Sequence, residues 1–81
     1  MNVEASVRTF LKDELGKDPD VGREDSLLES GTVDSVGVMR LVAFLETTYG
    51  ITVEEDDLMP DNFDTIAAIA AFVARRQAAH G

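Results

Sequence analysis

The sequence predicts an all-α fold of one domain, residues 1–81, with three longer helices, one short helix and a frayed tail at residues 77–81. Three observations favour this class. Apolar residues recur at helical spacing in three segments, and residues that cap or stop helices flank those segments. The only strand-like pattern, residues 51–53, has no partner elsewhere in the chain.

The first helix is predicted to begin after Asn2 and to end at Gly16. Asn2 is of the type that caps a helix N-terminus, and glycine commonly ends a helix. The apolar residues of this segment share one helical face: Val3, Val7, Phe10, Leu11 and Leu15.

Residues 17–34 are predicted to form a long connection, because Asp, Pro, Gly and Ser residues of turn type crowd them. Asp25 or Ser26 is expected to cap a single helical turn there. Leu27 and Leu28 are expected to pin the connection to the core. A connection of this length is uncommon unless it is functional.

The second helix is predicted over residues 35–49, ending at Gly50, and it has two apolar faces. Successive residues advance by about 100° around a helix, which separates the two sets. The core face consists of Val38, Leu41, Val42, Leu45 and Tyr49. The second arc consists of Val36, Met39 and Ala43.

The second arc has two interpretations. A small bundle buries one face of a helix, so an additional apolar arc flanked by Arg40 and Glu46 is a candidate docking surface. Alternatively, the short third helix or the long connection covers it. Phe44 belongs to neither face and is expected to meet the short third helix.

Asp34 and Ser35 stand at the start of this helix, and either can serve as its N-cap. The same place suits a phosphate, because free N–H groups and the positive end of the helix dipole lie there. A serine in the first turn is also open to modification. Gly37 costs about 1 kcal/mol relative to alanine in a helix. Either a modifying enzyme needs that bare surface, or the cost is tolerated.

Residues 51–63 are predicted to hold a short helical turn or two, packed by Leu58 and Phe63. The last helix is expected to start after Asp64 or Thr65, since either residue can cap it. Its buried stripe consists of Ile66, Ile69, Ala70 and Val73. Two arginines follow near its C-terminal end, where positive charge suits the helix dipole.

The charge pattern excludes some partners. The formal net charge is −9, and residues 41–74 hold no lysine or arginine. Such a field repels nucleic acid and anionic membranes and suits basic surfaces on proteins, although the acids also serve solubility. No apolar run is long enough for a membrane span, and no signal-peptide pattern is present. The chain is therefore expected to be a cytoplasmic monomer.

Catalytic and metal-binding interpretations find little support. The chain has no cysteine, which excludes thiol catalysis and cysteine-based zinc sites. A serine hydrolase needs a base near its nucleophile, and the single histidine, His80, lies in the predicted tail. The acids of residues 54–57 are typical of a solvated run that starts a helix, and they lack the spacing of a calcium loop. No metal site is predicted.

Several motifs, taken together, resemble the acyl carrier protein family over nearly the whole chain. They are Asp25-Ser26-Leu27-Leu28-Glu29-Ser30-Gly31, Asp34-Ser35-Val36-Gly37, Leu45-Glu46, Gly50-Ile51, Asp57-Leu58 and Asn62-Phe63-Asp64-Thr65-Ile66. The Asp-Ser pair alone is a weak signal. Its place at a helix head, between the Leu-Leu loop and the Asn-Phe turn, makes the combination specific.

The resemblance implies a four-helix bundle with a non-catalytic role. Position for position, Ser35 would carry 4'-phosphopantetheine through a phosphodiester, with Asp34 beside it. The thiol of that arm would hold an acyl, aminoacyl or polyketide intermediate as a thioester. The residues that would line a shelter for an acyl chain are Leu41, Leu45, Ile66 and Ile69.

The resemblance also makes the second helix the recognition helix for partner enzymes. These would be a phosphopantetheinyl transferase, a loading ligase, and synthases or transferases with basic docking patches. Val36, Met39 and Ala43 would supply apolar contacts. Asp34 and Glu46 would face basic residues of the partner.

The chain departs from the family pattern at two positions of this helix. Val36 replaces the usual leucine after the serine, and Arg40 occupies a position that is often acidic in carriers of fatty acid synthesis. An arginine there would oppose a basic residue of a partner. The departure favours a discrete carrier dedicated to one fatty-acyl, polyketide or related pathway.

Two alternatives stay open. One is an aminoacyl or peptidyl carrier served by a stand-alone ligase. The other is an acidic helical module that docks a partner through the second arc and carries no cofactor. Modification of Ser35 separates the carriers from the docking module.

Overall fold

Four α-helices form the part of the chain that the structure, a computed structural model, describes: residues 2–80, with side chains described through residue 78. They are α1 (Val3–Asp13), α2 (Ser35–Tyr49), α3 (Pro60–Phe63) and α4 (Ile66–His80). A 3₁₀ turn, η1 (Glu55–Asp57), precedes α3. The predicted helical fold is confirmed, and no strand occurs within residues 2–80.

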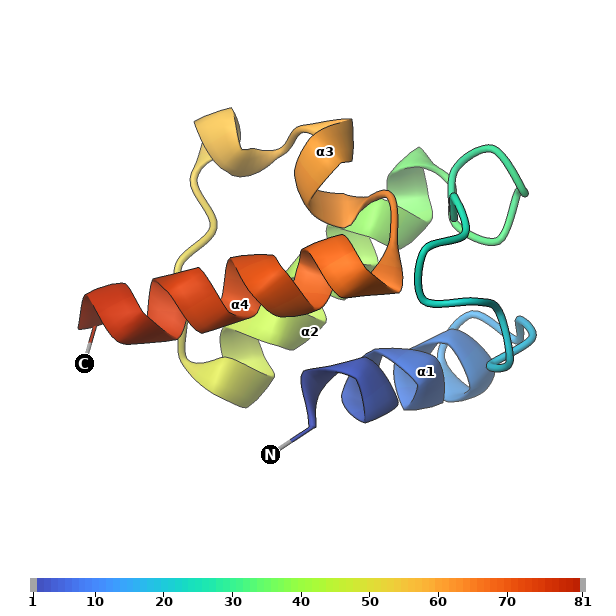
Figure 1. Ribbon diagram of the computed structural model, residues 1–81, viewed down its shortest axis with the longest axis horizontal. Coiled ribbons are helices and arrows are strands. Elements are labelled where there is room, and N and C mark those ends of the chain that lie inside the picture. Colours follow the sequence, from blue (N-terminus) through green and yellow to red (C-terminus); the bar gives the residue numbers. More distant parts are fainter. Residues whose placement is uncertain (1, 81) are drawn as a thin grey trace.

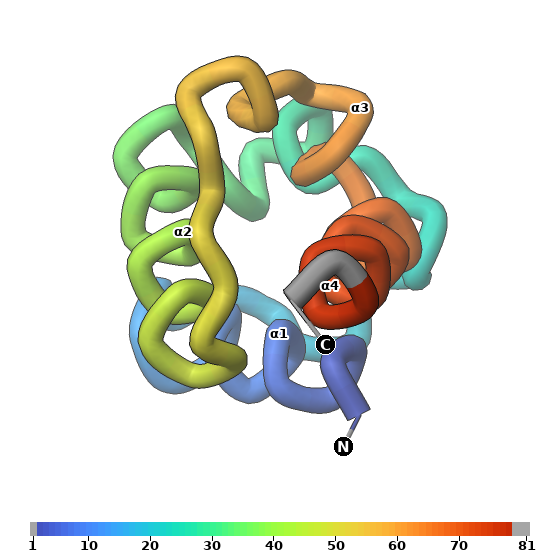
Figure 2. Tube along the Cα trace, turned by 90° about the vertical axis from the view of Figure 1, so that its left-hand side faces the viewer, coloured from blue at the N-terminus to red at the C-terminus, as the bar shows by residue number. Residues whose placement is uncertain are grey.

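The helix α4 is the element that joins the others, since it contacts α1, α2 and α3. In Figure 1 it crosses the molecule in front of α2, and α1 lies below it. Seen from the side in Figure 2, α1, α2 and α4 surround the centre, with α3 beside the N-terminal end of α4. None of the helices within residues 2–80 has the length and apolar character of a bilayer span.

The predicted apolar stripes meet in one core. Its buried members are Val7, Phe10, Leu11, Leu27, Val33, Leu41, Val42, Leu45, Ile51, Phe63, Ile66, Ile69, Phe72 and Val73. Phe72 was not expected there. It packs on Phe63 with ring centroids 5.2 Å apart, so α3 is tied to α4 through an aromatic pair.

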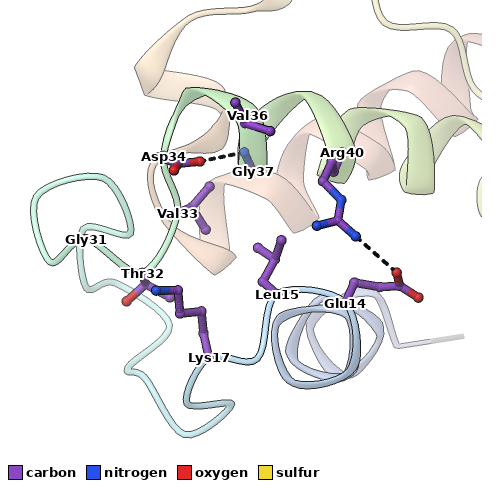
Figure 3. A pocket seen from close by; sticks show the side chains of 10 residues that line it. All are labelled: Glu14, Leu15, Lys17, Gly31, Thr32, Val33, Asp34, Val36, Gly37 and Arg40. Atoms are coloured by element: carbon purple, nitrogen blue, oxygen red, sulfur yellow. Dashed lines mark hydrogen bonds and ion pairs between the residues drawn. The ribbon is translucent and has the colours of Figure 1, made fainter.

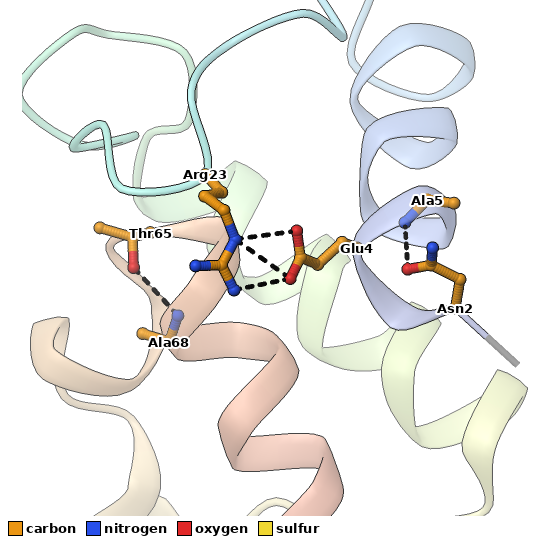
Figure 4. Close-up of polar contacts among 6 residues, drawn as sticks. All are labelled: Asn2, Glu4, Ala5, Arg23, Thr65 and Ala68. Carbon is orange, nitrogen blue, oxygen red and sulfur yellow. Dashed lines mark hydrogen bonds and ion pairs between the residues drawn. The ribbon is translucent and has the colours of Figure 1, made fainter.

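The predicted caps are confirmed at three helix ends. Asn2 Oδ1 accepts a hydrogen bond from the Ala5 N–H at 3.2 Å, and α1 ends at Asp13, before the expected Gly16. Thr65, rather than Asp64, caps α4 by accepting from the Ala68 N–H at 3.0 Å (Figure 4). Gly50 ends α2 in the left-handed conformation, with φ of 65°.

The long connection between α1 and α2 is held at several points along its length. Arg8 of α1 donates hydrogen bonds to the carbonyls of Pro19 and Val21, each at 2.6 Å. Arg23 donates to the Glu4 carboxylate, with the nearest pair of atoms 2.8 Å apart (Figure 4). These bonds fix the connection against α1.

The expected single turn at Leu27 and Leu28 forms, and Ser26 rather than Asp25 caps it. The Ser26 hydroxyl accepts from the Glu29 N–H at 3.0 Å and donates to Asp64 Oδ1 at 2.7 Å. Leu27 is fully buried, whereas Leu28 is half-buried. The turn therefore joins the core and the junction between α3 and α4.

Two expected contacts are wrong. Phe44 does not meet the short third helix but packs on Phe10 of α1, with ring centroids 5.0 Å apart. Leu58 does not pack inward and is 38% exposed. The four-residue α3 is too short to cover α2, and polar contacts hold the segment before it.

Those polar contacts use the acidic run of residues 54–57. Asp57 Oδ2 accepts from the Glu54 N–H at 2.9 Å and pairs with the Arg76 guanidinium of α4. The Glu54 N–H, and then Arg76, hold the pKa of the Asp57 carboxyl below its ordinary value. These acids form the start of the 3₁₀ turn, which confirms the prediction that they start a helical segment.

The fraying expected for residues 77–81 stays a prediction. The helix α4 is continuous through His80, and Gly81 lies outside the described residues.

Candidate functional site

Ser35 is the first residue of α2, and its side chain is exposed. No hydrogen bond joins its hydroxyl to another residue of the described chain. The first N–H groups of an α-helix have no acceptor within the helix, and the positive end of the dipole lies there. A nucleophilic hydroxyl thus stands free at a place that favours negative charge.

Asp34 is the N-cap of α2. Its Oδ1 accepts a hydrogen bond from the Gly37 N–H at 2.8 Å, while its own backbone is extended. The sequence offered Asp34 and Ser35 as candidates for the N-cap. Asp34 is the cap, so the Ser35 side chain does not cap the helix.

Gly37 lies buried beneath this cap. A β-carbon at this position would stand 3.1 Å from Val33 Cγ1, 3.3 Å from Asp34 Oδ1 and 3.5 Å from Leu15 Cδ1. One interpretation of the sequence held that the glycine gives a modifying enzyme a bare surface, and the burial of Gly37 shows that this is wrong. Its missing side chain lets the first turn of α2 sit closely on the connection and the end of α1.

The second arc is exposed. Val36 is 68% exposed, Met39 is 55% exposed, and Ala43 is also on the surface. Neither the connection nor α3 covers them, so the interpretation of a covered arc is wrong. Large apolar side chains on the surface of a small domain are candidates for contacts with other molecules.

Two hollows flank the head of α2. One, of about 300 Å³, is mainly apolar, and Ser35 stands at its edge. It is lined by Leu28, Ser35, Val38, Met39, Leu58, Met59, Pro60 and Phe63. It lies between α2 and the α3 region, because the short α3 leaves that side of α2 open.

The other hollow, of about 230 Å³, lies between the end of α1 and the first turns of α2 (Figure 3). Its lining includes Leu15, Val33, Val36, Lys17 and Arg40. Arg40 Nη2 lies 3.4 Å from a Glu14 carboxylate oxygen across this hollow. Sequence reasoning did not find this hollow, because it depends on where the connection returns to α1.

The remaining candidate residues have definite places. Glu46 is half-buried, and its Oε2 accepts from the Val53 N–H at 2.9 Å. The residues expected to line an acyl shelter are all fully buried in the core: Leu41, Leu45, Ile66 and Ile69. Within the described chain, no three His, Cys, Asp or Glu residues are grouped so that they could hold a metal ion.

The site fits a covalent phosphodiester on Ser35. Such a link needs an exposed hydroxyl, donors for the phosphate oxygens and space for the attached chain. The free hydroxyl, the uncapped N–H groups of the first turn and the adjacent apolar hollow meet these needs.

Comparisons with known proteins agree with this geometry. Residues 5–73 match the family described as the phosphopantetheine attachment site. The D-alanyl carrier protein 2 of Lactiplantibacillus plantarum is 32% identical over 76 residues, covering 94% of this chain and 95% of that protein. The acyl carrier protein of Chlamydia trachomatis serovar D is 28% identical over 78 residues, covering 95% and 99%.

The family match covers most of the chain and includes the head of α2. Its members are non-catalytic carriers that hold 4'-phosphopantetheine covalently and interact with transferases and acyl-handling enzymes. This chain therefore belongs to the phosphopantetheine-binding family of carrier proteins.

Proposed function

We propose that Ser35 is the attachment residue and that the chain presents its cargo to partner enzymes from the head of α2. One observation carries the proposal: the Ser35 hydroxyl is exposed and unengaged at the N-terminus of a 15-residue helix whose cap is the preceding Asp34. Among the serines of the described chain, Ser26 and Ser30 make side-chain hydrogen bonds within the connection.

The attachment step balances as a phosphoryl transfer from coenzyme A. The Ser35 oxygen forms a bond to the phosphorus next to the pantetheine, and the pyrophosphate bond of coenzyme A breaks. Adenosine 3',5'-bisphosphate leaves, and the hydroxyl proton passes to the transferase. Because coenzyme A is the donor, the proposal places this step in the cytoplasm.

The residues around Ser35 then position the attached group and stabilise the negative charge of its phosphodiester. The N–H groups of the first turn would hold the phosphodiester, and the helix dipole would favour its negative charge. Asp34 keeps the turn formed through its bond to Gly37. The attached arm supplies a thiol, which holds the cargo as a thioester.

The partner surface in this proposal is the second arc with its flanks. Val36, Met39 and Ala43 supply apolar contact, and their exposure supports this role. Arg40 and Glu46 lie on the flanks. Glu46 already accepts from the Val53 N–H, so a partner has to share that carboxylate.

The test is the intact mass after incubation with coenzyme A and a broad-specificity phosphopantetheinyl transferase. We expect the wild type to gain the mass of one phosphopantetheine and Ser35→Ala to gain none. Ser30→Ala is the matched control, since it removes a nearby serine of the connection and should be modified like the wild type. Modification of a folded Ser35→Ala would contradict the proposal.

The cargo is proposed to be an acyl-type group in a fatty-acyl, polyketide or related pathway. The similarity to a D-alanyl carrier protein favours an aminoacyl cargo as the second candidate. To distinguish the two cargoes, the modified protein is incubated with an acyl-loading ligase and, separately, with a D-alanine-loading ligase. Intact mass then shows which group is attached. Failure of every transferase to modify a folded sample would instead favour the docking module without a cofactor.

A further inference from the structure

Arg40 is a positive charge in an acidic part of the sequence. It is the only lysine or arginine between Arg23 and Arg75, a stretch that contains many acids. It also lies one helical turn after Val36 on α2, so it borders the exposed second arc. Its side chain is 51% exposed. A partner that covers this arc therefore meets a positive charge on a chain whose net charge is −9.

The acids at the two ends of α2 do not pair with that charge. Asp34 uses its carboxylate as the helix cap, and Glu46 binds the Val53 N–H. Both carboxylates are thus held by backbone N–H groups. The side-chain carboxylate that the structure pairs with Arg40 is that of Glu14, at the end of α1.

The contact between Arg40 and Glu14 is easily exchanged. The nearest atoms are 3.4 Å apart, and the Glu14 side chain is 57% exposed. Exposed pairs with a single long contact contribute little to stability, because water and salt screen them. Figure 3 shows the Glu14 carboxylate reaching toward the guanidinium from the opposite side of the hollow. A carboxylate from another molecule can therefore take its place.

The hollow has room for such a side chain. Its volume is about 230 Å³, and Leu15, Val33 and Val36 form apolar parts of its lining. Lys17 extends along the side away from Arg40 (Figure 3), so a second cation stands at the rim. A guanidinium binds a carboxylate through paired hydrogen bonds of defined geometry.

We infer that Arg40 is a partner-selecting residue. It favours enzymes that place an aspartate or glutamate opposite the middle of α2, where that carboxylate displaces Glu14. It opposes enzymes that place a lysine or arginine there. The rest of the docking face of such an enzyme remains basic, because the remainder of this chain is acidic. The inference rests on the proposed attachment at Ser35.

The experiment measures kcat/KM for modification by a phosphopantetheinyl transferase with a basic carrier-binding face, using coenzyme A. Arg40→Glu should raise kcat/KM at least threefold through a lower KM. Glu14→Gln should lower it, because that change leaves the Arg40 charge unpaired. Both effects should shrink at high salt. Equal Tm values for the variants exclude a general loss of structure.

Lys12→Glu is the matched control. It makes the same change in net charge on α1, where Lys12 is exposed and makes no side-chain hydrogen bond or ion pair among the described residues. It should raise kcat/KM by less than Arg40→Glu. If the two variants behave alike, overall charge explains the effect and the inference is overturned.

A double-mutant cycle tests the preference for an acidic partner. Each basic residue of the transferase face that covers α2 is changed to glutamate in turn. One of these transferase variants should show a higher kcat/KM for the wild type than for Arg40→Glu, which is the reverse of the order expected with the unmodified transferase. If no enzyme variant reverses it, Arg40 does not select partners. Absence of modification in all variants would instead contradict the attachment proposal itself.

Discussion

Gly37 and Asp34 together explain how the head of α2 leaves Ser35 free. The glycine allows the first helical turn to approach Val33 and Leu15, and the aspartate caps that turn through the Gly37 N–H. Because the preceding residue is the cap, the serine hydroxyl is not needed for the helix. One side chain is thus left available for modification at the end of a stable helix.

This arrangement predicts a separable role for Asp34. We expect Asp34→Ala to lower the free energy of unfolding by about 1 kcal/mol, because the N-cap acceptor is lost. Asp34→Asn should lose much less, since its side-chain oxygen can still accept from Gly37. Urea unfolding of both variants checks this. An equal loss in the two variants would show that charge, rather than the hydrogen bond, stabilises the helix head.

The segment between α2 and α4 depends on α4 for its position. The helix α3 has four residues, too few for independent stability. Arg76 of α4 pairs with Asp57, and Arg75 donates to Asn62 at 3.3 Å. Anchored on α4 in this way, α3 leaves the neighbouring face of α2 open, and the apolar hollow beside Ser35 results.

The Asp57 anchor predicts a dependence of stability on pH. The folded pKa of Asp57 lies below its value in the unfolded chain, which is about 4. Its contribution is therefore present above about pH 4 and is lost as the pH falls through the lower folded pKa. We expect Asp57→Asn to destabilise the protein at neutral pH, with the difference from the wild type shrinking under acid conditions.

Unfolding by urea at neutral and acid pH measures that difference. Asp56→Asn is the control, because it removes a neighbouring carboxylate that is exposed and lies outside the Arg76 pair. A difference for Asp57→Asn that stays constant from pH 7 to acid would contradict the assigned role. Arg76→Met should reduce the pH dependence, since the Glu54 N–H bond alone would then remain.

The long connection belongs to the core of the molecule. Leu27 is fully buried, and its N–H donates to the Asp64 carbonyl at 2.6 Å. Arg23 holds the same connection to α1 through Glu4, whose pKa is lowered by that hydrogen bond. The segment that leads into Ser35 is thus held by α1 and by the junction between α3 and α4.

Leu27→Ala should therefore destabilise the whole domain. Loss of a fully buried leucine costs about 2–5 kcal/mol, a large part of the stability of a small domain. Leu28→Ala should cost clearly less, because Leu28 is half-buried at the edge of the apolar hollow. Thermal and urea unfolding followed by circular dichroism compare the two. A loss for Leu27→Ala as small as that for Leu28→Ala would show that the connection does not share the core.

Local pattern was enough to predict the helices, the candidate residues for most caps and the second apolar arc, but only the folded chain decided which candidates cap and that the arc is exposed. Helical periodicity and cap chemistry involve residues a few positions apart, so they can be read along the chain. The second arc at Val36 and Met39 was visible for that reason, and the resemblance at Ser35 rested on motifs of the same short range.

Other features depended on how distant segments pack. The pairing of Phe44 with Phe10, the anchor between Arg76 and Asp57, and the hollow behind Arg40 join residues that are far apart in sequence. The burial of Gly37 and the bond between Glu46 and Val53 also became visible only in the folded chain. Such contacts follow from the approach of whole helices, and no spacing within one helix predicts them.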